Sequence, residues 1–136
     1  MKVTLFGTAA AEGFPAMFCE CDNCKRAREQ GGRNIRTRSE ALVDDSLLID
    51  FGPDLLTHTL YSGLSLIPVT DVIITHSHED HLLASNIWSR CDGIGHIKDK
   101  KPLNIHCTKA SFDMLSETKK NMGVNLPFRF RKWRNQ

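Results

Sequence analysis

Metal-binding side chains are concentrated in residues 76–81, whose sequence is HSHEDH. Imidazole and carboxylate groups are ligands that zinc, iron and manganese accept. Alternate side chains of an extended chain point the same way, so His76 and His78 are expected to share one metal ion. Asp80 and His81 follow where the chain turns, and we expect them to point to a second, nearby position. The pattern predicts a metal site with these four residues as ligands.

The residues that precede this cluster support a metal site over a plain surface turn. Asp71–Thr75 is rich in β-branched residues, which predicts a buried strand that ends where the histidines begin. The carboxyl end of a strand is a common place for a functional site. The alternative is a histidine-rich surface turn, or buried histidines bonded to backbone carbonyls. Four potential ligands within six residues, directly after an apolar strand, favour metal binding.

A second cluster, Cys19, Cys21 and Cys24, has the spacing Cys-x-Cys-x-x-Cys within residues 19–24. Thiolates this close suit a structural zinc ion, which needs a fourth ligand. A reduced cluster without metal is the alternative. The chain has five cysteines, an odd number, and no secretion signal, so a disulfide framework is not expected.

The periodicity of the chain predicts strands and helices that alternate after the first hairpin. The predicted strands are residues 2–6, 40–43, 46–49, 71–75 and 103–107, and the predicted helices are 22–30, 54–62, 82–90 and 109–122. In the second helix, Leu55, Leu56, Thr59 and Leu60 are expected to face the core, with His58 exposed. Residues 128–136 are expected to form a frayed end.

Composition limits the classes of protein and partner. At 136 residues, with 40% hydrophobic and 25% charged residues, the chain is expected to form one globular domain. No apolar stretch approaches the ~20 residues of a membrane span, and no signal peptide is evident, so we expect a cytoplasmic protein without membrane contact. Net charge is +2, and the basic residues between Lys25 and Arg38 lack interleaved aromatic residues, so nucleic acid is not an expected partner.

These motifs together resemble a known family. Residues 76–81 resemble the signature of the metallo-β-lactamase fold superfamily, and residues 48–52 (LIDFG) resemble its upstream strand end, which carries an aspartate. Residues 1–15 (MKVTLFGTAAAEGFP) and the cysteine segment resemble the phosphodiesterase branch of that superfamily. This branch includes the carbon–phosphorus lyase-associated phosphodiesterases and the pyrroloquinoline quinone biosynthesis B proteins.

The resemblance implies a fold. Family members are four-layer αββα sandwiches built from two similar halves, and this chain resembles the first half. We therefore expect an α/β (α+β) fold in which residues 1–136 form a mixed sheet with flanking helices, the N-terminal half of the sandwich.

The resemblance also implies a chemistry, that of a metal-dependent hydrolase and most specifically a phosphodiesterase. Two divalent ions, zinc or manganese, would generate a hydroxide that attacks phosphorus. His76 and His78 would bind the first ion, Asp80 and His81 the second, and Asp80 is also assigned a catalytic role. Asp50 would fix the geometry of the ligand histidines from behind. Capping of the following turn is the alternative role for Asp50.

Two functions remain open because the family's other ligands, two histidines and a bridging aspartate, would fall beyond Gln136. The first is a phosphodiesterase for a small phosphodiester or similar molecule, slow or inactive as this chain alone. The second is a non-catalytic metal-binding half-domain that pairs with a second copy or a completing partner chain, because a half-sandwich exposes one face of its sheet. The fourth ligand of the cysteine cluster, a C-terminal histidine in the family, has no counterpart here.

Overall fold

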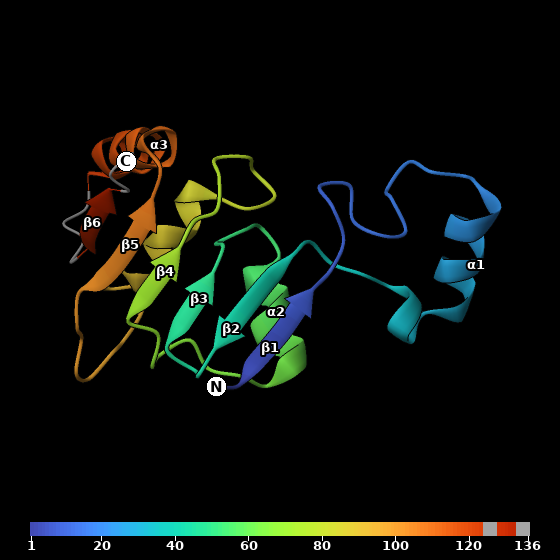
Figure 1. The fold of residues 1–136 in the computed structure, drawn as a ribbon, viewed down its shortest axis with the longest axis horizontal. Coiled ribbons are helices and arrows are strands. Elements are labelled where there is room, and N and C mark those ends of the chain that lie inside the picture. Colours follow the sequence, from blue (N-terminus) through green and yellow to red (C-terminus); the bar gives the residue numbers. More distant parts are fainter. Residues whose placement is uncertain (124–127, 133–136) are drawn as a thin grey trace.

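A mixed sheet of six strands forms the centre of the protein, for which a computed structural model describes residues 1–123 and 128–132 (Figure 1). The strands are β1 (Val3–Gly7), β2 (Glu40–Val43), β3 (Leu47–Ile49), β4 (Asp71–Ile73), β5 (Leu103–Cys107) and β6 (Phe128–Lys132). They stand in the sheet in their chain order. The pairs β1–β2 and β2–β3 are antiparallel, and β3 to β6 are parallel. The expected mixed sheet is confirmed.

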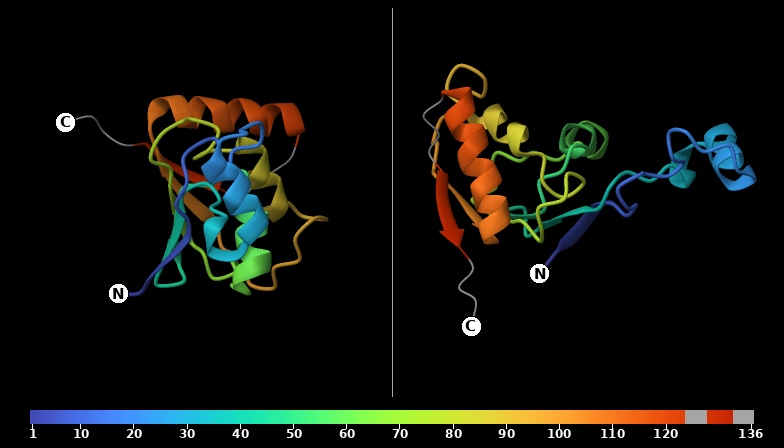
Figure 2. Two further views of the ribbon diagram at one scale, coloured as in Figure 1. Left: turned by 90° about the vertical axis from the view of Figure 1, so that its right-hand side faces the viewer. Right: turned by 90° about the horizontal axis from the view of Figure 1, so that it is seen from above.

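Helical segments cover one face of this sheet. They are α2 (Leu55–Ser62), η2 (Ala84–Arg90) and α3 (Lys109–Met122). Two further helices, α1 (Asp22–Gln30) and η1 (Gly32–Asn34), belong to the segment of the chain that connects β1 to β2. Parallel neighbours need crossover connections, and their shared handedness puts successive crossovers on the same face. Figure 2 shows α2, η2 and α3 on one side of the strands. In the described part of the chain, none of the helices has the length and hydropathy that a membrane span requires.

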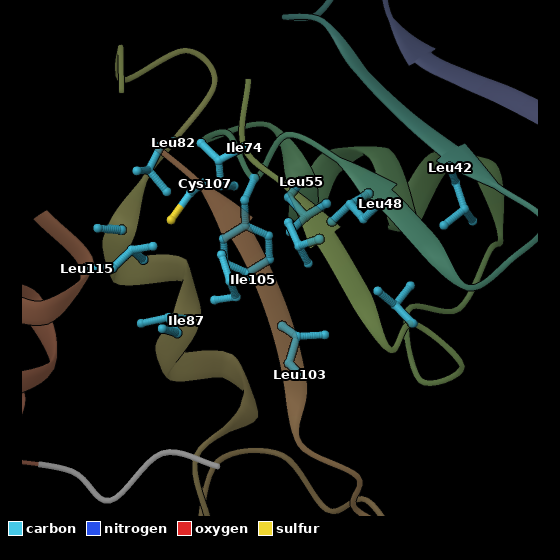
Figure 3. Close-up of a cluster of buried hydrophobic side chains, with 14 of the residues drawn as sticks. Leu42, Leu48, Leu55, Ile74, Leu82, Ile87, Leu103, Ile105, Cys107 and Leu115 are labelled. Carbon is cyan, nitrogen blue, oxygen red and sulfur yellow. The ribbon is translucent and has the colours of Figure 1, made fainter. Parts of the chain in front are cut away.

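The core lies between the sheet and these helices (Figure 3). Leu48 pairs with Val72, and Val72 with Ile105, so three buried side chains stand in a row across β3, β4 and β5. Ile87 from η2 and Leu115 from α3 cover this row and are themselves buried. Alternation along each strand therefore directs one set of side chains into the core.

The other set lies on the opposite face of the sheet, which we call the open face. Ile49 pairs with Ile73, and Ile73 with His106, and all three are partly exposed. On β1, Val3 and Leu5 are 50% and 67% exposed. The helices described above lie on the far side (Figure 2). The open face thus combines apolar strand residues with solvent exposure.

Residues 8–39 form an arm that contains α1 and extends away from the sheet (Figures 1 and 2). Its base is tied to the body by hydrogen bonds from the N–H groups of Thr8 and Ala9 to Thr37 O, at 3.0 and 2.9 Å. Arg38 Nη1 also lies 2.9 Å from Asp54 Oδ1, and this ion pair is largely buried. The two ends of the arm are therefore held together while its tip is free of the sheet.

The expected orientation of the helix α2 was wrong. Leu56 and Leu60 are 70% and 71% exposed, whereas Leu55 and His58 are buried. The reason is that His58 has a buried partner, the carboxylate of Glu40 on β2. The buried partner on β2 draws His58 into the core, so that of the expected apolar stripe Leu55 is buried as predicted while Leu56 and Leu60 face solvent.

Two other expectations need correction. The segment expected as an α-helix over residues 82–90 is instead a 3-10 helix, η2. Its Trp88 side chain is 48% exposed and so lies at the surface rather than in the core. Residues 128–132 form the strand β6 rather than a frayed end, and Phe130 packs edge-to-face on Phe112 with ring centroids 5.2 Å apart. This contact between β6 and α3 supplies the burial that fixes the strand. Residues 133–136 lie outside the described residues.

Replacing Ile87 by alanine (Ile87→Ala) is expected to lower the free energy of unfolding by about 2–5 kcal/mol, because its side chain is fully buried. Leu56→Ala, on the exposed face of α2, is the control and should change it by less than about 0.5 kcal/mol. Urea unfolding followed by circular dichroism measures both. Equal losses in the two variants would contradict the assigned core.

Candidate metal centre

The predicted ligands occupy the loop between β4 and η2, at the carboxyl end of β4. β3 and β4 are parallel neighbours, so their carboxyl ends lie side by side, and Asp50 N donates to Ile73 O at 2.8 Å. His78 O accepts hydrogen bonds from the N–H groups of His81 (3.0 Å) and Leu82 (2.8 Å), which turns the loop back. The residues that follow β3 and the histidine motif therefore meet at one edge of the sheet.

His76, Asp80 and His81 converge in this loop. Each offers a ligand atom, and these atoms lie within 4.8 Å of one another. Asp80 Oδ2 lies 3.2 Å from His81 Nε2, and the ring centroids of His76 and His81 are 4.1 Å apart. Because an ion sits about 2.0–2.2 Å from such ligands, ligand atoms of one tetrahedral ion are roughly 3.4 Å apart, so the more distant pairs here would move closer to enclose one. Two imidazoles and a carboxylate also form a donor set found in catalytic zinc sites.

His78 lies next to this group but outside it. Its ring is exposed and packs edge-on to His76, with centroids 4.8 Å apart. Alternation along an extended chain predicts that His76 and His78 share an ion. The structure instead gathers His76 with Asp80 and His81, because the chain turns directly after His78.

Asp50 supports the centre through hydrogen bonds to His81 and Thr75. It is only 4% exposed, and its Oδ2 lies 2.6 Å from His81 Nδ1. Its Oδ1 accepts hydrogen bonds from the N–H and the hydroxyl of Thr75, both at 2.8 Å. The contact with Asp50 engages Nδ1 of His81, which leaves Nε2 as the ring nitrogen that faces Asp80. A carboxylate behind a histidine in this way orients the ring and raises its basicity as a ligand.

The segment Asp50–Gly52, which we call the strap, runs along the motif loop. Phe51 N donates to His81 O at 2.8 Å, and Phe51 O accepts from Leu83 N at 2.9 Å. Gly52 lies so close to the loop that a Cβ added there would be 2.4 Å from Asp80 O. Asp50 itself has a φ of 68°, a left-handed conformation that costs energy in a non-glycine residue. The strap is therefore held in a conformation that the contacts with the loop must stabilise.

Two residues that support the strap were not indicated by the motifs. The Glu40 carboxylate accepts a hydrogen bond from Gly52 N, and its other oxygen contacts His58. A signal for Glu40 does exist in the sequence, since it lies two residues before Leu42 and so on the same, core-facing side of β2. No comparable signal marks His58.

The three cysteines of the second cluster also converge, at the start of α1 on the arm. Their sulfur atoms lie within 4.8 Å of one another, and Cys19 and Cys21 are 3.3 Å apart. The backbone N–H of Cys24 donates to the Cys21 sulfur and, with Cys19, lowers the pKa of Cys21 to about 7. Thiolate is the form that binds zinc, so this cluster suits a metal. In the described residues, the group contains these three ligands and no fourth.

The basic residues near α1 act partly as braces for the arm. Arg28 donates to the carbonyl groups of Cys19 (2.8 Å) and Ala16 (2.6 Å) and so fixes the loop that carries the cysteines. Figures 1 and 2 show α1 standing clear of the sheet that carries the histidine loop. The cysteine cluster and the histidine centre are therefore separate sites.

The sequence comparisons agree with this arrangement. The sequence model of the metallo-beta-lactamase superfamily matches residues 42–121, which include β3, the strap and the histidine loop. The coenzyme PQQ synthesis protein B of Methylobacterium radiotolerans is 25% identical over 129 residues, covering 85% of this chain. The Acinetobacter baumannii protein of the same name is also 25% identical over 129 residues. The chain spans only 40% and 39% of the lengths of these two relatives.

Solved structures share the fold. A diphosphatase from the PhnP family has a TM-score of 0.74 and 20% identity, with 97% of this chain covering 50% of that chain. Zinc-bound PqqB from Methylobacterium extorquens has a TM-score of 0.72 and 21% identity, with 96% of this chain covering 45% of that one. Human tRNase Z, short form, has a TM-score of 0.63 and 23% identity, with coverage of 97% and 43%.

The match of the sequence model spans more than half of the chain, and the mixed sheet with its flanking helices corresponds to about half of each related structure. The chain therefore belongs to the metallo-β-lactamase superfamily and has the fold of the N-terminal portion of its members.

Proposed function

We propose that this chain provides the metal-binding half of a metal-dependent hydrolase whose substrate is a small phosphodiester. The observation that carries this proposal is the convergence of His76, Asp80 and His81 at the carboxyl end of β4, with Asp50 bonded to the back of His81. Likeness to a PhnP-family diphosphatase favours a phosphorus substrate. The five free cysteines are in keeping with a reducing compartment, and we place the protein in the cytoplasm.

His76, Asp80 and His81 would hold a divalent ion, zinc or manganese. We propose that His78, whose ring packs edge-on against His76, would contribute to a second ion. Such ions, when bound, supply Lewis acidity that lowers the pKa of water and neutralises charge on phosphoryl oxygens. Asp50 would hold His81 through Nδ1 and leave Nε2 as the ligand atom. The partial exposure of the three ligands leaves the centre open to substrate. On the arm, Cys19, Cys21 and Cys24 would hold a structural zinc ion.

A second candidate function is a non-catalytic half-domain that associates with a second copy or a completing partner chain. The open face of the sheet favours it, because Val3 and Leu5 are 50% and 67% exposed beside partly exposed Ile49 and Ile73. Apolar surface of this kind commonly marks an interface.

One sample tests both candidates. Purified chain is loaded with zinc or manganese, and its metal content is measured. Hydrolysis of bis(p-nitrophenyl) phosphate is then assayed, and size-exclusion chromatography of the same material gives the oligomeric state. The hydrolase proposal predicts that the variant Cys19→Ser/Cys21→Ser, which lacks the cysteine site, still binds metal. It also predicts slow hydrolysis that requires this remaining metal. Bound metal without hydrolysis in a dimer supports the second candidate. A metal-free, inactive monomer contradicts both.

A further inference from the structure

A buried acid and a buried histidine form a pair directly behind the strap. Glu40 and His58 are each 4% exposed, and Glu40 Oε2 lies 2.5 Å from His58 Nδ1. The other ring nitrogen, Nε2, lies 2.7 Å from Thr37 Oγ1, and the ring stacks on Phe6 with centroids 5.5 Å apart. Contacts on both edges and one face thus fix the imidazole.

Such a pair is a poor means of stabilising a core. Removal from water disfavours the ionised carboxylate and raises the pKa of Glu40 despite its contact with His58. Apolar side chains of similar volume commonly stabilise a protein as well as a buried ion pair does. A polar pair at this place therefore calls for a role other than core stability, and such pairs can instead fix one particular geometry.

The geometry in question is that of Gly52. Glu40 Oε1 accepts the hydrogen bond from Gly52 N at 2.5 Å, while Asn86 Nδ2 donates to Gly52 O at 2.7 Å. Side chains therefore hold both the N–H and the carbonyl of Gly52. Gly52 also lies against the backbone carbonyl of Asp80, from which an added Cβ would be 2.4 Å away. A shift of Gly52 toward or away from Glu40 would change its contact with Asp80.

The rest of the strap transmits this position to the ligands. Phe51 N is bonded to His81 O, and Asp50 is bonded to His81 Nδ1. A displaced Gly52 would therefore move the two groups that orient His81, in addition to the carbonyl of Asp80. Metal sites lose affinity when ligand positions are disturbed from behind.

We propose that Glu40, fixed by His58 and Thr37, is a positioning residue of the metal centre, which acts through Gly52 to hold the strap against the Asp80–His81 loop. It touches neither ion nor substrate. The inference rests on the proposed function, because it assumes that His76, Asp80 and His81 bind a metal ion.

The test is a Co²⁺ titration of the full chain with Glu40→Ala and Glu40→Gln. Thiolate-to-cobalt charge-transfer bands report the cysteine cluster as an internal control. Both sites give d–d bands, so those of the histidine centre are read in a Cys19→Ser/Cys21→Ser background. We expect Glu40→Ala to lower Co²⁺ affinity at the histidine centre by about 10–100-fold, the usual effect of losing support behind a ligand. The thiolate bands should be unchanged. Glu40→Gln keeps an oxygen for Gly52 N and should restore part of the affinity.

Two further variants keep the test decisive if Glu40→Ala folds poorly. Thr37→Val removes only the contact to His58 Nε2 and should give a smaller loss in the same direction. Leu115→Ala removes a buried side chain of α3, a helix that carries neither the strap nor a ligand. It destabilises the core and should leave Co²⁺ affinity unchanged. Amide hydrogen exchange at Gly52 and Thr75, measured by NMR without metal, should accelerate more than exchange in β5 in Glu40→Ala and Thr37→Val. In Leu115→Ala, exchange at Gly52 and Thr75 should change no more than exchange in β5.

The outcomes separate this inference from the proposed function. Native chain that shows thiolate bands but no binding at the histidine centre would overturn the proposed function, and amide exchange would still decide whether Glu40 fixes the strap. Native binding at the histidine centre, with unchanged affinity and exchange in Glu40→Ala and Thr37→Val, would overturn the positioning role alone.

Discussion

Replacing Asp80 by alanine (Asp80→Ala) is expected to lower the divalent-metal affinity of the histidine centre by about 100-fold or more, beyond the 10–100-fold typical of supporting residues. Asp80 is the only anionic member of the group, and its Oδ2 lies 3.2 Å from His81 Nε2. Without it, two imidazoles remain, fewer than the three protein ligands of a catalytic zinc site. Competition with a chelator of known affinity measures the loss.

Glu79→Ala is the matched control, because Glu79 is the adjacent acid, is exposed and lies outside the group. It should leave the affinity close to native. His78→Ala should have a smaller effect than His76→Ala, because His78 lies outside the group. Equal losses for Asp80→Ala and Glu79→Ala would mean that overall charge, rather than ligation, determines metal binding.

Gly52→Ala is expected to reduce both the stability of the protein and its metal affinity. The new Cβ would lie 2.4 Å from Asp80 O and 3.3 Å from Asp80 C, and these backbone atoms cannot rotate away as a side chain would. The strap or the loop must shift, at a cost of about 1–3 kcal/mol, as in other overpacked sites. Because the shift moves Asp80 and His81, metal affinity should fall by about 10–100-fold. Urea unfolding and Co²⁺ titration measure the two effects.

Gly63→Ala separates these effects. Gly63 ends α2 with a φ of 66°, and nothing lies within 4 Å of its added Cβ. This variant should lose about 1 kcal/mol through backbone strain alone, with native metal affinity. If Gly52→Ala binds metal as tightly as Gly63→Ala does, the strap does not determine the position of the ligands.

Local sequence signals predicted most of the elements. The strand over 103–107 and the helix over 109–122 have the observed bounds, because a stop signal or a change of periodicity marks their ends. Gly123, for example, ends α3 in a left-handed conformation. The helix that ends at Gln30 was also predicted, with Asp22 as its cap, but Cys21 is the N-cap and Asp22 the first helical residue. The strand β6 was missed because its burial depends on Phe112, a contact with another element that periodicity cannot show.

The candidate site was only partly predictable for a related reason. The histidine motif lies within six residues, so its ligand types are visible in the sequence. Which of them converge depends on the turn after His78, where alternation no longer applies. The support from Glu40 joins β2 to α2, 18 residues further on, and no local pattern predicts such a pair. Candidate metal ligands are thus easier to recognise in a sequence than the residues that position those ligands.

The agreement between chain order and spatial order in the sheet has a consequence for biosynthesis. From β2 onward, each strand adds to the edge left by the strand before it, so a nascent polypeptide can extend the sheet as it leaves the ribosome. Such sequential pairing means that each new strand closes only the connection that leads to it, which limits the entropy cost of each step. The β1–β2 pair is different, because the arm lies between these strands and its ends must first come together. We therefore expect β1 to join the sheet as a separate, slower step of assembly.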